Sequence, residues 1–159
     1  MSYQFLSSDF AVSGQIDSNT LAALVGQGFS DVICNRPDGE SDEQPSAEQI
    51  AASAADCGLT VHYVPVIPGQ FKAEDAISVG RIIASAKGKV LGYCRTGNRS
   101  SHLWAIDQLL RGVNQCELEE LGQRAGFDLS QVLTLFNRDD ITESEAAEVS
   151  VSKTPGRQS

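Results

Sequence analysis

Short apolar runs alternate with longer helical patterns along the first part of the chain. The short runs are rich in β-branched side chains, as buried strands are, and they cover residues 29–34, 59–66 and 89–93. In between, apolar side chains recur every three or four residues, which predicts helices over residues 17–27, 46–57 and 73–86. This alternation favours an α/β fold with a central, mostly parallel sheet flanked by helices on both faces. Ligands of such folds bind beyond the carboxyl ends of the strands.

The remainder of the chain is predicted to be helical and then polar. Apolar side chains recur at helical spacing over residues 103–113, and two further helices are expected over residues 116–125 and 129–137. Residues 139–159 are polar and acidic, so we interpret them as a solvated tail. The chain length is that of one domain, and no repeat or linker divides it. We therefore predict a single domain over residues 1–138 that precedes the tail.

Charge and cysteine content exclude several classes of function. The net charge is −9 and the twelve basic residues are scattered, which argues against a nucleic-acid-binding surface. The amino terminus lacks the pattern of a secretory signal and no run reaches transmembrane length, so we expect a cytoplasmic protein without membrane contact. Four widely spaced cysteines form no CxxC pair, and we expect neither a metal nor a cofactor.

The segment GYCRTGNRSSHLW carries the candidate chemistry. Cys94 follows a predicted strand, Gly97 lies in mid-loop, and a helix is expected soon after Arg99. Backbone N–H groups of such a loop converge on one point, where the helix N-terminus and the arginine add positive charge. These charges favour the thiolate form of the cysteine, which is therefore the predicted nucleophile. Ser100 or Ser101 is expected to cap the helix and to donate a hydrogen bond to the sulfur.

The rest of the loop is a candidate site for binding a small anionic substrate. Backbone amides of residues 95–99 are expected to stabilise the negative charge of the substrate, and Arg99 is expected to orient it. Arg95 either reaches the anion or projects into solvent. The other residues assigned to substrate binding are Thr96, Gly97, Asn98 and Ser100.

Three residues around the loop NRPDGESDEQP are further candidates. Arg36 would add positive charge at the rim of the site, and an ion pair within its acidic loop explains it equally well. Asp38 is a candidate acid, although a role in the turn also accounts for it. Cys34 is a candidate redox partner that would form a disulfide with Cys94, but buried cysteines in strands are common.

Two enzyme families have loops that resemble CRTGNR. The string matches the C-R-x-G-x-R active loop of rhodanese sulfurtransferases, and it resembles the C-x-x-G-x-x-R phosphate loop of cysteine-dependent phosphatases with one residue missing. Over residues 3–112, a series of motifs resembles the phosphatase-like domain of the beta-lactamase hydrolase-like family: SGQID, GFSDVICNRPDGE, QPS, VHYVPV and YCRTGNRSS. The resemblance implies the fold of dual-specificity phosphatases with Cys94 as nucleophile. Some members of that family are fused to a persulfide dioxygenase and act as sulfur transferases.

Loop length and proton donation bear on the choice between sulfur and phosphate. By resemblance, a six-residue loop such as Cys94 to Arg99 goes with sulfane sulfur and a seven-residue loop with phosphate. Cysteine phosphatases also hold an aspartic acid after the preceding strand, whereas residues 65–71 contain no acid. Glu74 and Asp75 lie just beyond, where charges in the first turn of a helix explain them better.

The sequence thus favours a sulfurtransferase. It would move sulfur from thiosulfate or a low-molecular-weight persulfide through a Cys94 persulfide to a thiol acceptor. A cysteine-dependent phosphatase that forms a phosphocysteine on Cys94 is the first alternative, and a non-catalytic redox or persulfide sensor is the second. The resemblance makes a persulfide dioxygenase the candidate protein partner.

Overall fold

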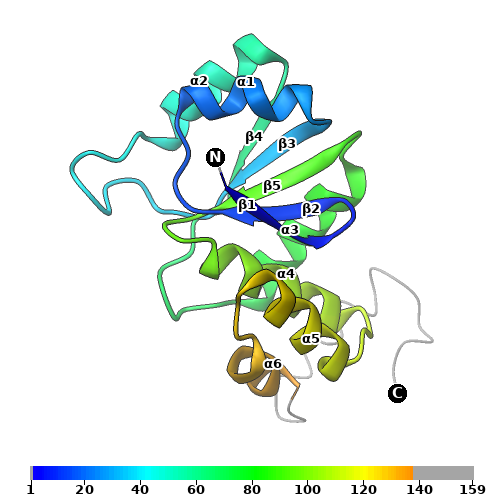
Figure 1. The fold of residues 1–159 in the computed structure, drawn as a ribbon. Coiled ribbons are helices and arrows are strands. Elements are labelled where there is room, and N and C mark those ends of the chain that lie inside the picture. The colour runs from blue at the N-terminus through cyan, green and yellow to red at the C-terminus, as the bar shows by residue number, and fades with distance from the viewer. Residues whose placement is uncertain (1, 138–159) are drawn as a thin grey trace.

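A five-stranded sheet forms the centre of the computed structural model, which describes residues 2–137 (Figure 1). The strands lie in the order β1-β2-β5-β3-β4. Their bounds are β1 Tyr3–Ser7, β2 Phe10–Ser13, β3 Phe29–Cys34, β4 Thr60–Tyr63 and β5 Lys89–Tyr93. β1 runs antiparallel to β2, whereas the pairs β2 with β5, β5 with β3 and β3 with β4 are parallel. The middle strand, β5, therefore has a parallel neighbour on each side.

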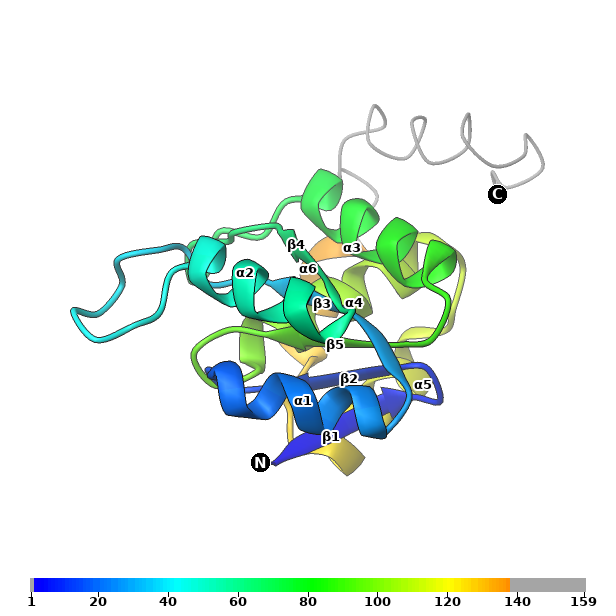
Figure 2. The same cartoon turned by 90° about the horizontal axis from the view of Figure 1, so that it is seen from above.

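Helices cover both faces of the sheet, as Figures 1 and 2 show. One face carries α1 (Ser18–Gly26) and α2 (Ala47–Cys57). The helices on the other side are α3 Ala73–Ser85, α4 Asn98–Leu110, α5 Gln115–Ala125 and α6 Ser130–Phe136. The prediction of a mostly parallel sheet flanked by helices on both faces is confirmed.

Two local features of the chain differ from the sequence prediction. β4 ends at Tyr63 rather than at residue 66, although Val64 N and Val66 N still donate to Cys34 O at 2.9 Å and to Asn35 O at 3.0 Å. The hairpin of β1 and β2 was not predicted from the sequence. Its connection runs through Ser8 and Asp9, which carry none of the Asn-Gly or Asp-Gly signals that identify a tight hairpin turn.

The sheet separates two hydrophobic cores, and β5 contributes to both. Val90 belongs to the core beneath α3 and α4, while Leu91 belongs to the core beneath α1 and α2. Both side chains are fully buried. Burying an aliphatic side chain of this size contributes about 1.5–3 kcal/mol, so both cores hold β5 in place.

The parallel register brings the carboxyl ends of three strands to one edge of the sheet. Tyr93, the last residue of β5, pairs with Ser13 of β2 and with Cys34 of β3. Cys94 follows directly, at the centre of that edge. The fold therefore presents the predicted nucleophile where parallel α/β proteins bind ligands.

Some sequence predictions fall outside what the structure describes. The predicted tail, residues 139–159, lies beyond the described residues, so the domain boundary near residue 138 stays a prediction. Within residues 2–137, no helix combines the length and the apolar character that crossing a bilayer requires.

Replacing Gly80 by alanine is expected to destabilise the packing of α3 on α4. A Cβ at this position would overlap the carboxylate of Asp107, which is buried and forms an ion pair with Arg111 at 2.8 Å. Displacing that carboxylate should lower the free energy of unfolding by about 1–3 kcal/mol in urea denaturation. Gly26→Ala is the matched control, because a Cβ there meets nothing within 4 Å and alanine favours a helix. Equal losses in both variants would contradict this interpretation.

Candidate active site

Cys94 begins a loop that folds back around its own sulfur. The Sγ atom accepts a hydrogen bond from the backbone N of Gly97 at 3.1 Å, and the residue is only 1% exposed. Two backbone hydrogen bonds of 3.4 Å tie the loop to the end of β2: Cys94 N donates to Ser13 O, and Gln15 N donates to Arg95 O. The sulfur therefore lies inside the loop and contacts one of its amides.

The loop ends where α4 begins, slightly earlier than predicted. Gly97 is the N-cap residue with φ +95°, and the helix starts at Asn98. Glycine adopts this left-handed conformation without the steric cost that other residues meet. The first turn of α4 contributes N–H groups and the positive end of a helix dipole, which together suit an anion.

The serines at the start of α4 bond to other partners than the sequence suggested. Ser100 is fully buried, and its Oγ donates to Oδ1 of Asn35 at 2.8 Å. Nδ2 of Asn35 in turn donates to Val64 O at 2.8 Å, so Ser100 fastens α4 to the ends of β3 and β4. Ser101 Oγ donates to Asn98 O at 2.7 Å, and no side chain caps the helix. These contacts replace the predicted serine cap and the predicted hydrogen bond to sulfur.

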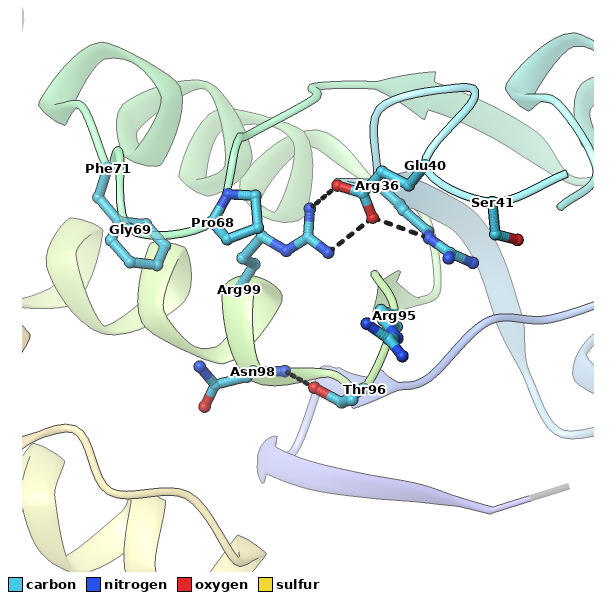
Figure 3. Close-up of a pocket in the computed structure, with 10 residues that line it drawn as sticks. All are labelled: Arg36, Glu40, Ser41, Pro68, Gly69, Phe71, Arg95, Thr96, Asn98 and Arg99. Carbon is cyan, nitrogen blue, oxygen red and sulfur yellow. Dashed lines mark hydrogen bonds and ion pairs between the residues drawn. The ribbon is translucent and has the colours of Figure 1, made fainter.

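Arg99 is held by Glu40, a residue that the sequence analysis missed (Figure 3). Nη1 of Arg99 donates to Oε2 of Glu40 at 2.7 Å, and Nη2 donates to Oε1 at 3.0 Å. Nη1 also donates to Val66 O at 2.9 Å. A guanidinium has five N–H donors, and within residues 2–137 these three hydrogen bonds leave the Nε–H and one Nη2–H for an anion. The two-point contact fixes the plane of the guanidinium.

The same carboxylate also binds Arg36, so two guanidinium groups share one negative charge. Nε of Arg36 lies 3.0 Å from Oε1 of Glu40, and Nη1 donates to Oε1 of Gln15 at 2.9 Å. Both arginine side chains are 8% exposed, and that of Glu40 is 22% exposed. The hydrogen bond from Arg99 and, to a smaller degree, the one from Arg36 hold the pKa of Glu40 below its ordinary value, against the effect of burial. Glu40 is therefore ionised at neutral pH.

A cavity of about 680 Å³ opens beside the loop. Predicted site residues that line it are Arg36, Arg95, Thr96, Asn98 and Arg99. Pro68, Gly69 and Phe71, from the segment after β4, form the other side (Figure 3). Cys94 itself is 1% exposed and is not among the residues that line the cavity. The structure thus gathers the predicted arginines, from two segments of the chain, around one cavity next to the predicted nucleophile.

Asp38 and Cys34 have partners of their own. Oδ1 of Asp38 accepts from Ala47 N at 2.8 Å, and the backbone N of Asp38 donates to the hydroxyl of Tyr63 at 3.0 Å. Asp38 therefore tethers its loop to α2 and β4. Cys34 is a buried free thiol whose Sγ lies 3.4 Å from Arg36 O, and burial raises its pKa. Its role as a redox partner stays a prediction.

Each of the two histidines lies within hydrogen-bond distance of a protein oxygen. Nε2 of His62 lies 2.8 Å from Oδ2 of Asp31 on the neighbouring strand. Nδ1 of His102 lies 2.7 Å from Asn98 O, and its ring stacks on Phe71 with 5.1 Å between centroids. Burial lowers the pKa of His102. Among the described residues, no group of three or more His, Cys, Asp or Glu side chains is arranged to hold a metal ion.

Sequence comparison connects the chain with one family. The family model described as beta-lactamase hydrolase-like protein, phosphatase-like domain, matches residues 2–111. The beta-lactamase hydrolase-like proteins of Xylella fastidiosa and Agrobacterium fabrum are 34% and 30% identical to the chain, over 82% and 74% of its length. The chain covers 31% and 28% of those proteins, so it spans less than a third of these relatives.

Solved structures with a similar fold include a candidate phosphatase and a protein in complex with pTyr. A candidate phosphatase from Neisseria meningitidis Z2491 is 30% identical with a TM-score of 0.77, over 86% of this chain and 97% of its own. Pseudomonas aeruginosa TpbA in complex with pTyr is 17% identical with a TM-score of 0.65, over 93% and 90%. These likenesses confirm the predicted cysteine-phosphatase fold. They favour a phosphatase-like enzyme over a sulfurtransferase, which the names of the relatives do not specifically support.

Gly97→Ala is expected to weaken anion binding. The alanine would have to adopt φ near +95°, and its Cβ would lie 3.2 Å from the ring of Phe127, so the amide that contacts the sulfur should shift. We expect inorganic phosphate to bind about tenfold more weakly in calorimetry, or roughly 1.4 kcal/mol. Gly112→Ala is the control, because its φ is +103° but a Cβ there meets nothing within 4 Å. Equal phosphate affinity in the two variants would refute the prediction.

The ion pairs of Glu40 should make stability depend on pH in the acid range. Because the folded-state pKa lies below the ordinary value of 4.5, the stabilisation is fully present above that value. It is lost as the pH falls through the lower folded-state pKa. The difference in unfolding free energy between the wild type and Glu40→Gln should therefore be constant from pH 5 to 7 and shrink below pH 4.5.

Urea denaturation across that pH range measures the difference. Glu43→Gln is the control, because Glu43 is an exposed acid of the same loop and its substitution should change stability little. The prediction would be contradicted if the difference in unfolding free energy between the wild type and Glu40→Gln stayed constant down to pH 3. The ionised carboxylate would then not stabilise the fold through its ion pairs with the arginines.

Proposed function

The chain belongs to the family of the beta-lactamase hydrolase-like protein, phosphatase-like domain, and we propose that it is a cysteine-dependent phosphatase acting through a phosphocysteine on Cys94. One observation carries the proposal: Glu40 holds the Arg99 guanidinium in a two-point contact next to the loop whose amide already contacts the cysteine sulfur. Phosphoryl transfer needs positive charge, N–H donors and a nucleophile at one place. In this proposal Arg99 supplies the positive charge, the loop amides supply the N–H donors and Cys94 is the nucleophile.

The proposed reaction has two steps. The Cys94 thiolate attacks phosphorus, so that a sulfur–phosphorus bond forms while the bond from phosphorus to the leaving oxygen breaks. Water then attacks the phosphocysteine, releases inorganic phosphate and restores the thiolate. The free N–H groups of Arg99 and the backbone amides of the loop stabilise the charge on the phosphoryl oxygens in both steps.

Sulfur transfer is the second candidate, and the length of the loop favours it. The loop from Cys94 to Arg99 has six residues, and the next position holds Ser100, whose hydroxyl is bonded to Asn35. In this alternative the thiolate takes the outer sulfur of thiosulfate and releases sulfite. Because the related structures favour phosphatase chemistry, we rank sulfur transfer below it. The redox-sensor alternative, the persulfide dioxygenase partner and the cytoplasmic location stay predictions.

Cys94→Ser should abolish hydrolysis of p-nitrophenyl phosphate. Removing a covalent nucleophile commonly lowers kcat by orders of magnitude, and we expect a loss of at least about 10³-fold. Cys116→Ser is the control, because Cys116 is exposed at the start of α5 and should leave the rate unchanged. Comparable rates in the wild type and Cys94→Ser would refute the phosphocysteine.

Intact mass after incubation with thiosulfate tests the second candidate. The phosphatase proposal predicts no stable adduct on the wild-type protein. An added sulfur on Cys94, together with no release of phosphate from p-nitrophenyl phosphate, would overturn the phosphatase proposal in favour of sulfur transfer.

A further inference from the structure

The cavity beside the Cys94 loop holds a carboxylate that cannot serve as a proton donor. Among the described residues that line the cavity, Glu40 is the one acidic side chain. Both of its oxygens bind guanidinium groups, and the hydrogen bond from Arg99 keeps its pKa low. Asp75, whose pKa burial raises, lies in the first turn of α3 and does not line the cavity. The described residues that line the cavity therefore include no carboxylic acid that could protonate a leaving group.

Positive charge in the cavity exceeds what this carboxylate neutralises. Arg36 and Arg99 share Glu40 although both side chains are nearly buried, and Arg95 lines the cavity as a third guanidinium. A thiolate at Cys94 balances one of these charges before the reaction. When the sulfur bonds to phosphorus, the transferred phosphoryl group brings negative charge of its own to Arg99. Arg95, which is exposed, then has no acidic partner among the described residues that line the cavity, so it can bind an anionic group of the substrate beyond the transferred phosphoryl group.

We propose that the substrates are phosphoanhydrides of small molecules, in which the leaving group is itself a phosphate. This inference rests on the proposed phosphatase function and names its substrate class. The Cys94 sulfur bonds to the terminal phosphorus while the bond from that phosphorus to the bridging oxygen breaks, and the electron pair stays on the departing phosphate. Water then replaces sulfur on phosphorus, the thiolate returns, and the proton of water passes to the phosphate products.

Among the described residues, no protonated acid lines the cavity, and this favours some kinds of phosphate substrate over others. A departing phosphate is stable as an anion near neutral pH, since the second pKa of a phosphate ester is about 6. An alkoxide is not, and protonation by a general acid typically contributes about 10²–10⁴-fold to its departure. A phosphoanhydride also gives Arg36 and Arg95 a second anionic group to bind. A cavity of about 680 Å³ has the size of a small-molecule site.

A comparison of three substrates with the full chain tests the inference. Inorganic tripolyphosphate contains phosphoanhydride bonds, p-nitrophenyl phosphate releases a stable phenolate, and glycerol 2-phosphate releases an alkoxide. We expect kcat/KM for glycerol 2-phosphate to be at least about 100-fold below that for tripolyphosphate. Values of kcat/KM for these two substrates that lie within tenfold of each other would overturn the inference. Asp75→Asn should leave turnover of tripolyphosphate unchanged, and a loss of that turnover would reveal a proton donor and overturn the inference as well.

Substitution of Arg95, the exposed arginine of the cavity, tests whether this side chain binds the departing phosphate. Arg95→Gln should lower kcat/KM for tripolyphosphate about tenfold more than that for p-nitrophenyl phosphate, because only the former has a second phosphate to bind. Arg81→Gln, an exposed position on α3, is the control and should change neither value. Equal losses on both substrates in Arg95→Gln would overturn the inference.

These measurements distinguish a failure of the phosphoanhydride preference from a failure of the proposed phosphatase function. Turnover of p-nitrophenyl phosphate that depends on Cys94, combined with equally fast turnover of glycerol 2-phosphate, would refute the anhydride preference and leave the phosphatase standing. No turnover of any of the three substrates, or turnover that survives Cys94→Ser, would refute both.

Discussion

The carboxylate of Glu40 holds two arginines that arrive from different parts of the chain. Arg36 follows β3 and Arg99 opens α4, and both side chains are nearly buried. Without the shared carboxylate, two guanidinium groups would face each other in a poorly solvated space and repel. With it, the loop after β3 and the loop after β5 form one site. The N–H groups of Arg99 that remain then have a fixed direction, which is what an anion-binding site requires.

The sheet provides the second constraint. β5 is buried on both faces between parallel neighbours, so its carboxyl end has little freedom, and Cys94 starts from that rigid point. Gly97 then turns the backbone so that its amide meets the sulfur and α4 begins at once. The packing of β5 thus positions Cys94, and the ion pair with Glu40 positions the guanidinium group of Arg99. The proposed phosphoryl chemistry needs both, and Glu40, the one acidic side chain among the described residues that line the cavity, is ionised and bound to the arginines.

The sequence predicted the elements whose signals are local. Hydrophobic periodicity identified β5 and α3 almost to the residue, and the loop pattern identified Cys94, Gly97 and Arg99. Glu40 was missed because it lies among several acids in one loop, and only its spacing of four from Arg36 distinguishes it. A hydrogen bond to the sulfur was predicted for Ser100 or Ser101 because the partner of Ser100, Asn35, is distant in sequence. The preference for sulfur rested on the length of one loop and on the lack of an acid in residues 65–71, whereas the likeness to phosphatases extends over most of the chain.

A crystal structure of the protein with vanadate tests the central claim most directly. Vanadate mimics the transferring phosphoryl group, and the account predicts that it binds covalently to Sγ of Cys94. Nε and Nη2 of Arg99 should donate to its oxygens while Nη1 and Nη2 keep their contacts with Glu40. Vanadate bound elsewhere in the cavity, or an Arg99 that leaves Glu40 in order to reach it, would contradict the account.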